Sequence, residues 1–137
     1  MAGTFGYELD PGKLTEEEKA EIREQVKAYK RAVSLIQTGD YYRLSDPFRD
    51  TCAAWAFVSE NRDRVLLNAV MTENHGNMPV SYVRLKGLEP ETLYRDTKTG
   101  ETYYGSALMR AGLPIPGGMG EYRAYQAELE AVKGIQF

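Results

Sequence analysis

The sequence has 137 residues, of which 42% are hydrophobic and 27% are charged, and its formal net charge is −3. This length suits one compact domain with a real core, and the slight acidic excess disfavours nucleic-acid and anionic-membrane partners, which both require a basic surface. The first residues show no secretory signal and no apolar run approaches the ~20 residues of a membrane span, so we expect a cytoplasmic protein.

The chain begins with a short apolar and aromatic run at residues 4–9, TFGYEL. A turn sequence, Asp10-Pro11-Gly12, follows this run directly. The pattern predicts a strand followed by a turn.

A long amphipathic helix is predicted from Thr15 to Thr38, with Gly39 ending it as a C′ residue. Thr15 and Glu18 have the spacing of a capping box. Apolar residues then recur at helical spacing on one face, namely Ile22, Val26, Tyr29, Val33 and Ile36. We expect this face to be buried at least partly against the rest of the chain.

From residue 40 onward the apolar period changes to two, which predicts short strands separated by turns. The predicted strands cover residues 40–44, 53–59, 64–71, 80–88, 93–96, 101–104 and 121–131. The last segment also fits a helix. Ser106–Gly112 is predicted to form one or two helical turns with Ser106 as N-cap, and the Gly- and Pro-rich residues 112–120 a loop.

The predicted fold is mainly β: an antiparallel Greek-key-type β-sandwich preceded by one strand and one long helix. The strand at residues 4–9 has no predicted neighbour to satisfy its backbone groups. We therefore interpret residues 1–38 as the last strand and helix of a larger unit, residues 39–132 as the sandwich and residues 133–137 as a tail. Residues 1–9 are expected to be mobile or to pair with another molecule.

No residue pattern predicts a self-sufficient catalytic, substrate-binding or metal site. His75 is the single histidine, so a metal cluster and a Ser/Cys–His triad with Ser59, Ser81 or Cys52 both lack support. Cys52 excludes an internal disulfide and is predicted to be buried and inert in the run CAAWAFV. Residues 117–120, GGMG, lack the Lys-Ser/Thr of a phosphate loop and are predicted to be a linker.

Glycoside hydrolysis uses two carboxylates, so the carboxylate pairs of this sequence are candidates for such a site. Glu8 and Asp10 lie on the same side of the first predicted strand, at the end where a barrel places active-site groups. Turn chemistry accounts for Asp10, and Glu8 is then expected to face a loop. The alternative for these two residues is a role at the rim of an active site. Turn chemistry also accounts for Asp46 and Asp50, which flank Pro47-Phe48. Trp55 is predicted to pack in a core, on the side opposite to its two alanine neighbours.

Several segments together resemble the retaining α-galactosidases of glycoside hydrolase family 36. They are FGYELD at 5–10, LTEEEKAEIREQVKAYK at 14–30, LIQTGDYYRLSDP at 35–47, AAWAFVSEN at 53–61, VRLKGLEPETLYR at 83–95 and YYGSALMRAGLPIP at 103–116. The resemblance covers most of the chain in order, but it does not include the KGIQF tail. It implies that residues 1–38 are the last βα unit of a (β/α)8 barrel that leads into a C-terminal β-sandwich.

The resemblance also implies a parent enzyme that releases terminal α-linked galactose from oligosaccharides of the melibiose and raffinose type. In the family, the nucleophilic Asp follows Lys-Trp on one barrel strand and a second Asp is the acid/base, and neither motif exists here. No catalytic residue is therefore carried over, and both carboxylates are expected upstream of Met1. The family implies a cytoplasmic homotetramer without a metal cofactor, whose α-galactoside binds in the barrel.

The ten tyrosines leave a second hypothesis open, since tyrosine-rich faces bind sugars. Tyrosine is also a favoured strand residue. A free-standing carbohydrate-binding sandwich would present a row of exposed, coplanar rings on one sheet, whereas a structural domain would bury them.

Overall fold

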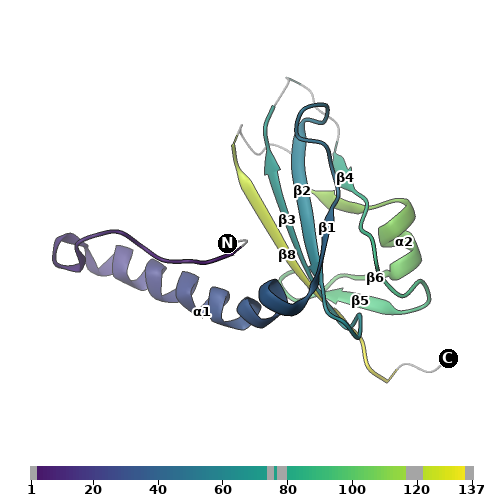
Figure 1. Cartoon of the computed structure of the whole chain (residues 1–137), viewed down its shortest axis with the longest axis horizontal. Coiled ribbons are helices and arrows are strands. Elements are labelled where there is room, and N and C mark those ends of the chain that lie inside the picture. The colour runs from purple at the N-terminus through teal and green to yellow at the C-terminus, as the bar shows by residue number, and fades with distance from the viewer. Residues whose placement is uncertain (1–2, 74–75, 77–79, 117–121, 135–137) are drawn as a thin grey trace.

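The computed structural model describes residues 3–73, 76, 80–116 and 122–134. A long helix leads into two antiparallel sheets and a short second helix (Figure 1). After a 3-10 turn at Pro11–Lys13, the elements are α1 (Glu16–Thr38), β1 (Asp40–Arg43), β2 (Cys52–Val58), β3 (Arg64–Met71), β4 (Ser81–Val83), β5 (Leu93–Asp96), β6 (Thr102–Tyr104), α2 (Gly105–Arg110), β7 (Leu113–Ile115) and β8 (Ala124–Ala131).

The strands form one six-stranded sheet in the order β1-β2-β3-β8-β5-β6 and a two-stranded sheet of β4 and β7. Every strand pair is antiparallel. The mainly β, sandwich-like prediction is confirmed, and residues 124–131 form a strand rather than a helix.

The main core lies between the two sheets. Alternate residues of β2 and β3 point into it, for example Ala54 and Ala56 from β2 and Leu67 from β3. Leu108 of α2 and Leu129 of β8 are also fully enclosed there. Alternation with period two thus sets one face of β2 and β3 against the second sheet.

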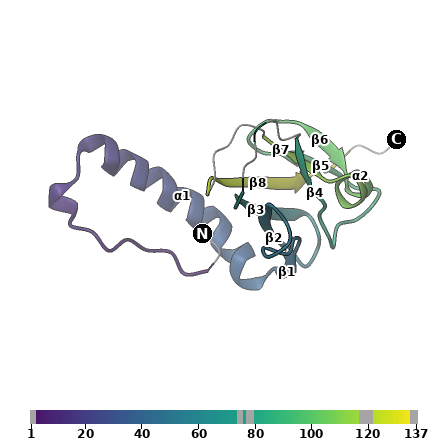
Figure 2. The same ribbon diagram turned by 90° about the horizontal axis from the view of Figure 1, so that it is seen from above.

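Helix α1 packs on the opposite face of the six-stranded sheet, and only its C-terminal end does so. Ala32, Leu35 and Ile36 are buried there against Phe57 and Leu66. The rest of the helix extends beyond the sheet (Figure 2). The predicted apolar face is therefore buried at Ile36 but only half-buried at its four earlier positions.

The start of α1 agrees with the predicted capping, but its end does not. Thr15 and Glu18 form the complete capping box that the sequence predicts. Gly39 is not a left-handed C′ residue, because its φ is −75° and it is the C-cap itself. Glycine is required there by close packing, since a Cβ would lie 2.5 Å from the Leu35 carbonyl oxygen and 2.9 Å from that of Val58.

Residues 4–9 form no strand in this structure, so that prediction is wrong for this chain. No other described strand lies beside them to complete a ladder, and they run in extended irregular form alongside α1 (Figure 1). Their anchors are side chains: the Phe5 and Tyr29 rings lie 5.2 Å apart, Tyr7 hydrogen-bonds Gln25, and the Tyr29 hydroxyl donates to the Gly3 carbonyl oxygen at 2.8 Å.

We expect the amides of residues 5–9 to exchange hydrogen rapidly in a dilute solution of this chain. They donate no backbone hydrogen bond to any described residue, and exchange protection follows such bonds. Hydrogen exchange followed by NMR checks this, with the Leu66 and Leu67 amides in the centre of the sheet as the slow reference. Strong protection of residues 5–9 in the monomer would contradict it.

Other boundaries also differ from the prediction. The strand expected at 80–88 is confined to Ser81–Val83, after which the Leu85 amide bonds Leu108 of α2 and the chain turns at Gly87, φ +74°. Strand β7 lies inside the predicted loop 112–120, of which residues 117–120 are outside the described part. Helix α2 starts directly after β6 with Tyr104 as N-cap, not Ser106, and Gly112 (φ +99°) ends it as predicted.

Candidate functional site

The carboxylates that the sequence singled out serve local turns. Asp10 accepts a hydrogen bond from the Gly12 amide at 2.9 Å, and both Asp10 and Glu8 are exposed. In the next turn, Asp46 accepts from the Phe48 amide at 3.0 Å and Asp50 accepts from the Asp46 amide at 2.8 Å. These bonds account for the three aspartates without a substrate, as turn chemistry predicts.

Cys52 and Trp55 lie on opposite faces of β2. Cys52 is 8% exposed in the main core, and burial raises the pKa of its thiol, so it is protonated and unreactive at neutral pH, as predicted. Trp55 faces away from Ala54 and Ala56 and packs, half-buried, beside the end of α1. The prediction of a buried residue is confirmed for Cys52, whereas Trp55 packs only half-buried at the edge of the smaller cluster.

The remaining candidates bring no reactive groups together. Ser59 bonds Asp63 at 3.0 Å and the Arg64 backbone, which fixes the turn between β2 and β3. His75 and residues 117–120 lie outside the described residues. Within the described part, no group of three metal-ligating side chains is found, and no helix is long and apolar enough to cross a membrane.

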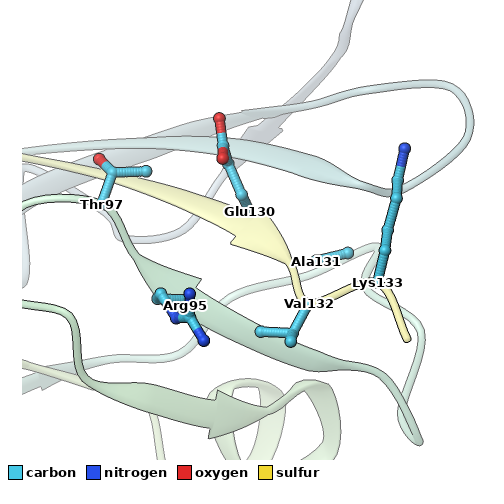
Figure 3. A pocket seen from close by; sticks show the side chains of 6 residues that line it. All are labelled: Arg95, Thr97, Glu130, Ala131, Val132 and Lys133. Atoms are coloured by element: carbon cyan, nitrogen blue, oxygen red, sulfur yellow. The ribbon is translucent and has the colours of Figure 1, made fainter. Parts of the chain in front are cut away.

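A hollow of about 290 Å³ lies beside the ends of β5 and β8. Arg95 and Glu130 are register partners on β5 and β8, their side chains do not point toward each other, and Lys133 lies just beyond the end of β8 (Figure 3). Lys133 also reaches Asp63 at 3.7 Å. Glu130 is the one carboxylate among the lining residues, and two are needed for the hydrolysis of a glycosidic bond.

A second hollow, of about 250 Å³, does contain two carboxylates, Asp96 and Glu101. Asp96 is 3% exposed and accepts from the Lys98 and Thr99 amides at 2.8 and 3.1 Å. Glu101 accepts from the Tyr103 hydroxyl at 2.5 Å, and this hydrogen bond, followed by burial, raises the pKa of Tyr103 to about 12. Both carboxylates thus have structural partners that account for their positions.

The exposed tyrosines do not form a sugar-binding row among the described residues. Tyr41 and Tyr104 occupy the two opposite edge strands of the large sheet, while Tyr82 belongs to the small one. The other two exposed tyrosines, Tyr7 and Tyr122, lie outside the strands. Tyr94 is completely buried; its hydroxyl donates to the Arg62 carbonyl at 2.8 Å and accepts from the Glu89 amide at 3.1 Å. This distribution disfavours a carbohydrate platform of coplanar rings.

Comparison with known proteins identifies the same family that the sequence segments resemble. The family model for the glycosyl hydrolase family 36 C-terminal domain matches residues 52–129. The chain is 50% identical over 97% of its length to the bifunctional α-galactosidase/sucrose kinase AgaSK of Mediterraneibacter gnavus, of which it covers 14%. It is 41% identical, again over 97% of its length, to the α-galactosidase AgaA of Geobacillus stearothermophilus, of which it covers 18%.

Solved structures show the same similarity. The galactosidase domain of AgaSK superimposes with a TM-score of 0.87 at 48% identity, over 93% of this chain and 18% of that one. The α-galactosidase AgaB of Geobacillus stearothermophilus gives a TM-score of 0.87 at 44% identity with the same coverage. The chain therefore spans less than one fifth of the length of the relatives it matches.

Proposed function

The chain belongs to glycosyl hydrolase family 36 and matches the C-terminal domain of that family, and we propose that it serves as the non-catalytic C-terminal domain of an α-galactosidase. The observation that carries this proposal is coverage: 97% of the chain aligns with AgaSK and AgaA, yet it makes up only 14% and 18% of them. The enzyme's catalytic apparatus then lies in the other part.

The parent reaction is the release of terminal α-linked galactose from oligosaccharides by a retaining double displacement. Its two catalytic aspartates are assigned to the preceding barrel, because the sequence of this chain contains neither of the two Asp motifs of the family. A solved structure of an AgaA variant contains raffinose, which supports an oligosaccharide of the raffinose type as the substrate. The chain's own residues do not handle the proton or the transferred sugar.

The chain's contribution is to hold the last barrel helix in place. We assign residues 1–38 to the end of the barrel, 39–132 to the sandwich and 133–137 to a tail. Leu35 and Ile36 at the end of α1 pack against Phe57 and Leu66 of the sheet. In addition, the Arg64 guanidinium donates to the Arg31 carbonyl oxygen at 3.2 Å and pairs with Glu128 at 2.5 Å.

The same proposal includes a cytoplasmic location and a homotetrameric parent. The buried, unpaired Cys52 suits a reducing compartment. The tetramer rests on the family resemblance alone.

We expect the purified chain to have no α-galactosidase activity, because it lacks the paired catalytic aspartates. A chromogenic α-galactoside provides the assay, with intact AgaA as the positive control. Turnover that follows this chain through successive purification steps would contradict the proposal.

A further inference from the structure

A third hollow, of about 530 Å³, lies at the end of the sandwich that is remote from α1 (Figure 1). One wall belongs to the segment 44–52, where the chain passes from β1 into β2, and the other is the segment 80–84, which contains β4 of the small sheet. Helix α1 packs on the opposite face of the large sheet. The hollow is therefore separate from the junction between α1 and the sheet.

Four hydroxyl side chains line this hollow, two on each wall. Ser45 and Thr51 belong to the first wall, and Ser81 and Tyr82 belong to β4. A hydroxyl group both donates and accepts hydrogen bonds. Ser45 Oγ accepts from the Ala54 amide at 2.7 Å, which fixes its position and leaves its proton to donate. The hollow therefore offers polar contacts from two sides.

One charged group of each sign also lines the hollow. Asp50 is held in place because its Oδ2 accepts from the Asp46 amide at 2.8 Å. The Arg84 guanidinium is exposed and makes no hydrogen bond or ion pair with any described residue. Because like charges in one site repel, an anionic ligand is disfavoured by Asp50 and a cationic one by Arg84. The pair therefore favours a neutral ligand whose polar groups bond to both.

Exposed apolar side chains gather around the same hollow. Eight large hydrophobic side chains are exposed among the described residues, and three of them, Phe48, Val80 and Tyr82, belong to its two wall segments. The Phe48 amide donates to Asp46 Oδ1 at 3.0 Å, so the turn presents this ring, which is 94% exposed, from a fixed backbone. Exposed apolar groups that gather in one place are typical of binding surfaces.

We propose that this hollow is an accessory binding site for a neutral sugar. A pyranose has an apolar face of C–H groups and a rim of hydroxyl groups, so it matches the Tyr82 ring beside hydroxyl and charged side chains. One ring in a hollow suffices for this, without a row of coplanar tyrosines. The volume lies in the range of about 300–1,000 Å³ that is usual for small-molecule sites. Asp50 is the one carboxylate in the lining, whereas glycoside hydrolysis requires two, so the site binds a sugar without cleaving it.

The test is an NMR titration of the purified chain with raffinose, which offers galactosyl, glucosyl and fructosyl residues in one neutral molecule. A parallel titration with inorganic phosphate probes the alternative that Arg84 holds an anion. Tyr82→Ala removes the ring from the hollow, and Arg84→Gln removes the unpaired positive charge. Tyr104→Ala is the matched control, because Tyr104 is also an exposed tyrosine of a three-residue strand but lies outside the lining.

We expect raffinose to shift the amide signals of residues 50–52 and 80–84 until they saturate. Tyr82→Ala should raise the dissociation constant at least about tenfold, which corresponds to about 1.4 kcal/mol and is the order of one ring contact. Arg84→Gln should also weaken binding, whereas Tyr104→Ala should leave the dissociation constant unchanged.

Three results would overturn this inference. The first is the absence of saturable shifts with raffinose. The second is saturation by phosphate but not by raffinose, which would identify an anion site instead. The third is equal affinity of the Tyr82→Ala and Tyr104→Ala variants, because the ring in the hollow would then take no part. All three leave the proposed function standing, since that function rests on the family assignment and not on this hollow.

Discussion

The Leu35→Asp substitution is expected to release α1 from the sheet while the sandwich stays folded. Leu35 is 4% exposed at the centre of the helix–sheet junction. A buried carboxylate without a partner costs about 3–5 kcal/mol, which is comparable with the burial of one or two leucine side chains at about 1.5–3 kcal/mol each. The junction has few other apolar contacts to offset this penalty.

A released α1 would lose helical structure, because helices in proteins gain most of their stability from tertiary packing of an amphipathic face. Far-UV circular dichroism therefore reports the loss of helix, and slow hydrogen exchange of the Leu66 and Leu67 amides in the centre of the sheet reports the intact sandwich. Gln37→Asp is the matched control: Gln37 is exposed on the same helical turn, so both variants place a carboxylate near the helix C-terminus. If Leu35→Asp and Gln37→Asp gave the same far-UV signal and the same denaturant midpoint, the junction would not be what holds α1 on the sheet.

The elements that the sequence predicted well are those whose pattern is local. Helix α1 shows an uninterrupted 3.6-residue period and a capping box, and its start at Glu16 follows the Thr15 cap. Strands β2 and β3 are apolar runs bounded by turns, and their observed limits lie within one residue of those predicted. In these segments, propensity and tertiary packing favour the same structure.

The elements that the sequence missed depend on partners that local pattern does not reveal. Strand β7 contains Pro114 in a three-residue strand on a two-stranded sheet, where a missing amide is tolerated. Residues 4–9 have strand composition but no neighbour to pair with. Gly39 has the composition of a left-handed cap, whereas its true role is a close approach to Val58 that only tertiary structure shows.

The extent of sheet that α1 covers was likewise not predictable from the sequence. Trp55 was predicted to be packed, and the apolar character of β2 on both faces was visible in the run CAAWAFV. What the sequence did not reveal is that α1 covers Phe57 but not Val70, because the length of sheet under a helix depends on where the helix leaves it. The lack of alternation in β2 and β3 indicates only that both faces of these strands are apolar.

The second large effect that we expect concerns a chimera in which this chain replaces the matching segment of AgaA. We expect this replacement to restore the α-galactosidase activity that AgaA loses when the segment is removed. This chain and the AgaA segment that it replaces are 41% identical. Their shared fold, with a TM-score of 0.86, means that this chain can replace the AgaA segment without a change of backbone topology. A sandwich that serves as a structural domain should therefore be exchangeable without a change in the catalytic residues.

The direct measurement is the α-galactosidase activity of that chimera on raffinose, beside AgaA truncated before the exchanged segment and intact AgaA. Our account predicts that truncated AgaA is inactive or insoluble and that this chain restores a soluble enzyme with a KM for raffinose close to that of intact AgaA. A soluble, folded chimera without activity would contradict the assignment of this chain as a non-catalytic domain of such an enzyme.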